Sequence, residues 1–169
     1  MKKTIKIIVS GDGGVGKTSF LNRLVHDSFD ANRQLTRGVD FYSKIIAVNG
    51  TKFNFIMWDF AGQDQFKTFL NGFVDGSLAA FILFDLTRIN TIENVQEWIV
   101  TLKEFGNIPI LLIGTKNDLV NPYESLSIDE FISEIKEEYE NIISYIKISS
   151  KTGENIKIAF EIMIEKLSF

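Results

Sequence analysis

The chain has 169 residues, a formal net charge of −4 and a hydrophobic fraction of 45%. This length suits a single domain with a substantial core, and we expect residues 1–169 to form one. The acidic balance gives no electrostatic reason to expect nucleic acid as a partner. The chain contains no cysteine, which excludes disulfides and any lipid anchor on a cysteine of this chain. Its apolar runs are all shorter than the roughly 18 residues of a membrane span.

The most informative stretch is the glycine-rich segment 9–18, VSGDGGVGKT. It follows an apolar run with strand character and precedes a segment with helical apolar spacing. Its pattern, G-x-x-x-x-G-K-T, is that of the phosphate-binding P-loop in the expected strand–loop–helix setting. Glycines let successive N–H groups turn inward around phosphate oxygens, and the following helix N-terminus favours anions. Lys17 adds a charge for the β- and γ-phosphates, and the Thr18 hydroxyl can bind Mg²⁺. The alternative is a glycine-rich turn with a chance lysine.

The remaining segments predict an α/β fold. Asn49-Gly50 joins two extended runs, residues 41–48 and 51–58, and predicts a β-hairpin. Buried strands then alternate with helices, which indicates a mixed six-stranded sheet, mainly parallel with one antiparallel strand, and helices on both faces. The other elements expected are a strand over 5–9, a helix ending near His26, a long polar loop over 28–39, strands over 78–84, 108–113 and 142–148, and helices over 92–102, from Ser127 to 135 and over 156–167.

A second polar motif, residues 58–63 (WDFAGQ), follows the second hairpin strand. Ligands of such sheets bind beyond the carboxyl ends of the strands, where this motif is expected to lie. The Asp59 carboxylate can hold Mg²⁺ directly or through water, the Gly62 N–H can approach a γ-phosphate, and Gln63 can orient the attacking water. The alternative is an ordinary turn with a capping aspartate.

Two later motifs can recognise a base. Asp118, in the segment 114–118 (GTKND), can accept hydrogen bonds from guanine N1–H and the exocyclic amine, whereas adenine would leave this carboxylate unpaired. The Lys116 stem can cover one face of the base. After the last strand, residues 149–151 (SSK) can offer a backbone N–H to guanine O6, and Lys151 can pack on the ring.

With five motifs in order over essentially its whole length, the chain resembles the Ras superfamily of small GTPases, and the Rab branch most closely. The segment 36–41 (TRGVDF) resembles the Rab switch I pattern, and residues 58–66 resemble switch II. The resemblance implies that Phe29 stacks on guanine and that Thr36 meets Mg²⁺ and the γ-phosphate. The nucleotide-binding residues so implied are Asp12, Gly13, Gly14, Val15, Gly16, Lys17, Thr18, Ser19, Phe29, Thr36, Gly62, Thr115, Lys116, Asp118, Ser149, Ser150 and Lys151.

The resemblance also assigns roles within this set. The catalytic residues would be Gln63, Lys17, Thr36 and Gly62, and the Mg²⁺ ligands Thr18, Thr36 and Asp59. Phe41, Trp58 and Phe73 would form an exposed aromatic surface that effectors recognise. The alternative for these rings is packing in the core.

The function implied is that of a GTP/GDP molecular switch with slow Mg²⁺-dependent hydrolysis, of order 10⁻⁴ to 10⁻³ s⁻¹. A Rab-like protein would act in membrane trafficking or signalling, with an effector, an exchange factor and a GTPase-activating protein as partners. We expect a cytoplasmic location, with any membrane association through partners or a tail outside this chain. Arg33 or Arg37 could supply a catalytic charge in cis. The alternatives are a nucleotide-binding interaction module that does not hydrolyse GTP and, disfavoured by Asp118, a P-loop ATPase or kinase.

Overall fold

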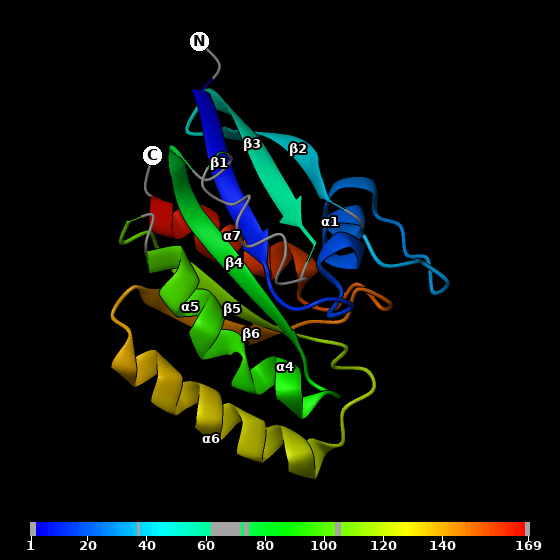
Figure 1. Cartoon of the computed structure of the whole chain (residues 1–169). Coiled ribbons are helices and arrows are strands. Elements are labelled where there is room, and N and C mark those ends of the chain that lie inside the picture. The colour runs from blue at the N-terminus through cyan, green and yellow to red at the C-terminus, as the bar shows by residue number, and fades with distance from the viewer. Residues whose placement is uncertain (1–2, 37, 62–71, 73–74, 104–105, 168–169) are drawn as a thin grey trace.

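The computed structural model describes residues 3–36, 38–61, 72, 75–103 and 106–167 (Figure 1). Its strands are β1 (Lys3–Ser10), β2 (Val39–Val48), β3 (Thr51–Phe60), β4 (Ser77–Asp85), β5 (Ile110–Thr115) and β6 (Ile142–Lys147). Its helices are α1 (Lys17–His26), α4 (Ile89–Glu93), α5 (Val95–Lys103), α6 (Pro122–Glu138) and α7 (Ile156–Leu167).

In the part of the chain that is described, the strands form one six-stranded sheet in the order β2-β3-β1-β4-β5-β6. β2 and β3 are antiparallel, and the other neighbouring pairs are parallel. The predicted hairpin is present: Asn49 and Gly50 have φ angles of 48° and 79°, as a two-residue turn between right-twisted strands requires. The predicted mixed sheet is therefore confirmed, and the strands parallel to β1 all end at one edge.

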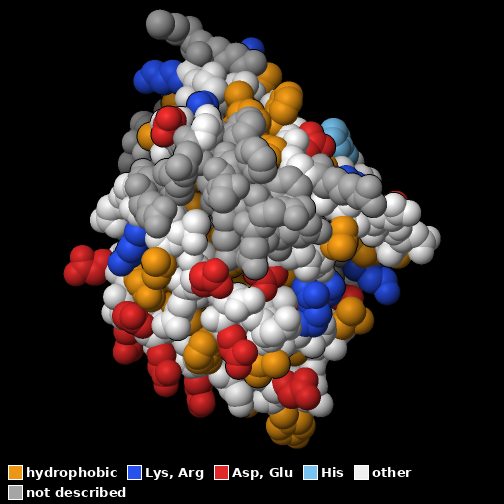
Figure 2. Space-filling model, viewed as in Figure 1, with side chains coloured by type: hydrophobic (Ala, Val, Ile, Leu, Met, Phe, Trp, Pro, Cys, Tyr) orange, Lys and Arg blue, Asp and Glu red, His pale blue; other side chains and the backbone are white. Residues whose placement is uncertain are grey.

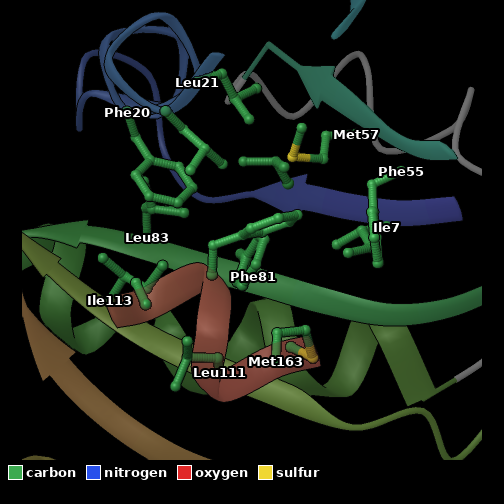
Figure 3. Packing of buried hydrophobic residues seen from close by; sticks show 14 of the residues in the cluster. Ile7, Phe20, Leu21, Phe55, Met57, Phe81, Leu83, Leu111, Ile113 and Met163 are labelled. Carbon is green, nitrogen blue, oxygen red and sulfur yellow. The ribbon is translucent and has the colours of Figure 1, made fainter. Parts of the chain in front are cut away.

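Both faces of the sheet are covered by helices, as predicted (Figure 1). One apolar cluster packs α1 and α7 against one face. Figure 3 shows its centre, where Phe20 of α1 meets Phe81 of β4 edge-to-face with ring centroids 5.6 Å apart. A second cluster packs α4, α5 and α6 against the opposite face through side chains such as Trp98 and Ile132. Because strand side chains alternate between faces, adjacent residues Ile7 and Ile8 enter different clusters.

The outer surface of α6 is acidic. Acidic side chains gather on the side of the molecule that carries this helix (Figure 2), in keeping with the negative net charge. Among the helices of the described residues, none combines the length and the apolar character needed to cross a membrane.

Three predicted elements differ from the structure. Helix α6 begins at Pro122, five residues before the expected start at Ser127. Asn121 caps it by accepting a hydrogen bond from the Tyr123 N–H at 2.9 Å, and proline at the first helical position needs no N–H partner. The helix expected over 92–102 is present as α4 and α5, which are separated at Asn94. The strand expected over 108–113 lies two residues later, at Ile110–Thr115.

The α6 boundary can be tested by replacing the two competing cap residues. We expect Asn121→Ala to lower the free energy of unfolding by about 1 kcal/mol, because the first-turn N–H of Tyr123 loses its acceptor. Ser127→Ala is the matched control: Ser127 is exposed within the helix, and its replacement should change stability by less than about 0.5 kcal/mol. Urea unfolding of both variants measures the difference, and equal costs would contradict the assigned start.

Candidate nucleotide-binding site

A cavity of about 440 Å³ lies at the carboxyl edge of the sheet. Its walls come from the P-loop, the segment 29–36 and the loops that follow β5 and β6. Most of the predicted nucleotide-binding residues line it, namely Gly13, Gly14, Val15, Gly16, Lys17, Thr18, Ser19, Phe29, Thr36, Thr115, Lys116, Asp118, Ser150 and Lys151. Arg33, Leu35 and Leu119 line it too. Leu119 belongs to no motif, so the sequence alone does not indicate its place in the cavity.

The P-loop begins with a close approach of backbone to backbone. Gly11 has a φ of 139°, and a Cβ at this position would lie 2.1 Å from the Leu83 carbonyl oxygen of β4. Only glycine fits such a contact. The loop is thereby pressed against the centre of the sheet before it turns back into α1.

Lys17 closes the P-loop from inside. Its Nζ donates to the carbonyl oxygens of Gly11, at 2.9 Å, and Asp12, at 2.8 Å. Burial lowers the pKa of Lys17 to about 8, against the opposing charges of Asp59 and Asp12. An ammonium group has three donors, so one remains for a phosphate oxygen, and a bound phosphate would favour the charged form.

Side chains from segments distant in the sequence donate to the P-loop carbonyls of residues 13 to 15. Arg88 Nη2 donates to the Gly13 oxygen at 2.8 Å, and Lys116 Nζ to the Gly14 oxygen at 3.3 Å. Thr115 Oγ1 donates to the Val15 oxygen at 2.5 Å. Because the C=O and N–H of a peptide point in opposite directions, outward carbonyls leave the N–H groups facing the cavity, as an anion site requires.

Arg88 and Lys116 both form ion pairs with the buried carboxylate of Asp85, at the end of β4. Its Oδ2 lies 3.2 Å from Arg88 Nε and 2.6 Å from Lys116 Nζ, and its Oδ1 accepts from the N–H and hydroxyl of Thr87. Burial alone would raise the pKa of Asp85, but hydrogen bonds from Lys116 and Thr87 outweigh it and hold the pKa below its usual value. Sequence reasoning missed Asp85 and Arg88, because their relation to the P-loop depends on the pairing of β1 with β4.

The three predicted metal ligands come together beside the P-loop. Thr18 Oγ1 donates to Asp59 Oδ2, and the hydroxyl oxygens of Thr18 and Thr36 are 2.6 Å apart. Burial raises the pKa of Asp59, and its Oδ1 is buried without a hydrogen bond from any described residue. Mg²⁺ prefers hydroxyl, carboxylate and phosphate oxygens, so this set fits the ion, and an unpartnered buried carboxylate oxygen is available for it.

At the base end of the cavity, Asp118 is oriented by its neighbour across the loop. Ser149 Oγ donates to Asp118 Oδ1 at 2.7 Å. Lys116 and Lys151 line the cavity together with Phe29, which is 39% exposed. Ser149 itself is buried and does not line the cavity. The other predicted base-recognition residues surround one space, namely Phe29, Lys116, Asp118, Ser150 and Lys151.

Several predicted residues stand apart from the cavity. The Asp12 carboxylate accepts from Asn94 Nδ2 at 2.7 Å and from Trp98 Nε1 at 2.8 Å, so this side chain secures α4 and α5 and does not line the cavity. Phe41 is 60% exposed, and its ring centroid lies 5.7 Å from that of half-buried Trp58. The exposure of Phe41 rules out core packing for this ring. Gly62, Gln63, Phe73 and Arg37 lie outside the described residues.

The fold and the cavity define an α/β protein of the P-loop nucleotide-binding class. The profile of the Ras family matches residues 6–169, and the chain belongs to this family of small GTPases. It is 35% identical over 161 residues to the Ras-related protein Rab-34 of Mus musculus, and equally so to those of Sus scrofa and Rattus norvegicus. These alignments cover 94% of this chain and 61% of each relative, so the chain spans about three fifths of their length. The resemblance inferred from the motifs is confirmed.

The role of Asp85 can be tested by Asp85→Asn. The amide no longer attracts Lys116 and Arg88, so the P-loop carbonyls lose their fixed donors, and we expect GDP affinity to fall by about ten- to a hundredfold. The matched control is Asp129→Asn, which breaks a 2.8 Å ion pair with Lys147 between α6 and β6. Titration calorimetry with GDP should show near wild-type affinity for the control; an equal loss in both would contradict a specific role for Asp85.

Proposed function

We propose that the chain is a GTP/GDP molecular switch that hydrolyses GTP slowly with Mg²⁺. The observation that carries the proposal is the contact of Thr36 with Thr18, whose hydroxyl in turn donates to Asp59. Residues 29–35 are exposed, and the Thr36 hydroxyl at the end of this loop contacts the P-loop threonine. The contact places a hydroxyl of an exposed loop at the proposed metal site, as a switch that responds to the γ-phosphate requires.

Each residue of the site would have its own role in binding or hydrolysis. Lys17 and the P-loop N–H groups would stabilise charge that develops on the γ-phosphoryl group, and Gln63 would orient the attacking water. Mg²⁺, held by Thr18, Thr36 and Asp59, would supply further charge neutralisation. Asp118 would select guanine over adenine.

Hydrolysis of GTP would change the conformation of two segments of the chain. The γ-phosphate would hold Thr36 and Gly62, and its loss would release the two segments that carry them. The exposed ring of Phe41 and the half-buried ring of Trp58, with Phe73, would then serve as the surface that distinguishes the two states for an effector. We further propose an exchange factor and an activating protein as partners, a cytoplasmic location, and a Rab-like role in trafficking or signalling; we expect no nucleic-acid partner.

The hydrolysis step can be tested by single-turnover kinetics. With GTP and Mg²⁺ we expect slow conversion by the wild type, at least tenfold slower conversion by Gln63→Leu because water is no longer oriented, and none with ATP. The substitution should leave GTP affinity close to that of the wild type. Tight GTP binding without turnover in either protein would instead favour the non-hydrolysing interaction module.

Arg33 is the described candidate for a catalytic charge in cis. It lines the cavity with Lys17 and Thr36, and it is among the cations that oppose the burial-driven rise in the pKa of Asp59. An arginine supplied in cis can raise intrinsic turnover to about 10⁻² s⁻¹. If Arg33 acts in this way, Arg33→Ala should slow single-turnover hydrolysis about twentyfold with little change in GTP affinity.

The control for Arg33 is Gln34→Ala, which alters the adjacent residue of the same cavity wall without removing a charge. It should hydrolyse GTP at the wild-type rate. Unchanged hydrolysis in both single variants and in the Arg33/Arg37 double alanine variant would remove the cis arginine from the mechanism.

A further inference from the structure

Arg23 of α1 lies behind the base end of the cavity, and all three nitrogens of its guanidinium group donate hydrogen bonds. Nε donates to the Ser150 carbonyl oxygen at 2.8 Å, and Nη2 to the Lys151 carbonyl oxygen at 2.7 Å. Nη1 lies 3.3 Å from both the carbonyl oxygen and Oδ1 of Asp27, at the end of the same helix. The side chain is 18% exposed, so it is a mostly buried connection between α1 and the loop 149–151.

The direction of these carbonyls decides where the loop's N–H groups point. The Ser149 carbonyl accepts from the Gly153 N–H at 2.9 Å, and the next two carbonyls accept from Arg23. With three successive carbonyls turned away, the N–H groups of Ser150 and Lys151 are directed toward the cavity that both residues line.

We propose that Arg23 is a positioning residue for base recognition, which holds the 150–151 N–H groups toward the oxygen at position 6 of the bound purine. This deepens the proposed function, since it rests on a guanine nucleotide occupying the cavity. Arg23 thereby adds to the discrimination of the base and slows release of the nucleotide. Because α1 begins at Lys17, the same helix supports the phosphate end and the base end of the ligand.

The second contact with the base does not depend on Arg23. Ser149, which orients Asp118, is held by its own bonds: its N–H donates to the Glu154 carbonyl at 3.2 Å, and its hydroxyl oxygen accepts from the Thr152 N–H at 3.1 Å. Recognition of the position-2 amine by Asp118 and recognition of the position-6 oxygen by the loop therefore depend on different direct hydrogen bonds. This separation makes the proposal testable with altered bases.

The experiment measures dissociation constants and dissociation rates for GDP, 6-thio-GDP and IDP with the wild type and Arg23→Ala. 6-thio-GDP replaces the oxygen at position 6 with a weaker acceptor, and IDP lacks the position-2 amine. For Arg23→Ala we expect GDP to dissociate about tenfold faster, because a directed hydrogen bond to the base is lost. The preference for GDP over 6-thio-GDP should fall at least threefold, and the preference for GDP over IDP should stay unchanged.

Two further variants separate positioning from general support. Lys44→Ala removes the 3.0 Å bond from Lys44 Nζ to the Leu24 carbonyl, which ties α1 to β2 instead of to the base loop, and should leave both preferences unchanged. Arg23→Lys keeps the charge and the stem but lacks the planar fork that reaches two carbonyls, so it should resemble Arg23→Ala in base preference while folding normally.

An equal loss of affinity for all three nucleotides in Arg23→Ala and Arg23→Lys, with both preferences intact, would overturn the proposal and leave Arg23 a structural residue. Failure of the proposed function has a different signature. If ADP is measured as a fourth nucleotide, the wild type itself would then show no preference for GDP over ADP.

Discussion

The site depends on one constraint, the hydrogen bonds that fix consecutive P-loop carbonyls in place. The oxygens of residues 11 to 16 each accept a hydrogen bond: from Lys17 for the first two, then from Arg88, Lys116, Thr115 and the Phe20 N–H. A loop held in this way keeps its N–H groups directed at the cavity before a phosphate arrives, so little reorganisation is needed on binding.

The supports of the phosphate end and the base end are shared. Lys116 belongs to the base motif, yet its Nζ holds a P-loop carbonyl and pairs with Asp85. Thr115, one residue earlier, also holds the P-loop, and Arg23 links the helix after the P-loop to the loop after β6. The two ends of the cavity are therefore linked through side chains that contact both.

Local patterns predicted the parts of this arrangement that are local. The P-loop spacing, the Asn49-Gly50 turn and the alternation of strands and helices depend on neighbouring residues, and each was recognised. The break at Asn94 was missed because that side chain is engaged by Asp12, 82 residues away. Arg23 and Arg88 were missed for the same reason, since their partners lie 127 and 75 residues distant and belong to no sequence pattern. The pair Asn121-Pro122 indicates the early start of α6, because asparagine is a good N-cap and proline suits the first helical position. The prediction followed the apolar spacing instead, and that spacing begins only after Ser127.

The backbone at Lys116 is held in a strained conformation. Its φ is 61°, a left-handed conformation that a long side chain adopts at a cost of about 1 to 3 kcal/mol. The other described non-glycine residues with positive φ are Asp27, Asn49 and Asn155, types that tolerate this conformation far better. Glycine would relieve the strain at Lys116 but would forfeit the ammonium group on which Asp85 and Gly14 depend. At this position a strained backbone conformation accompanies a side chain that supports both the buried Asp85 carboxylate and the P-loop.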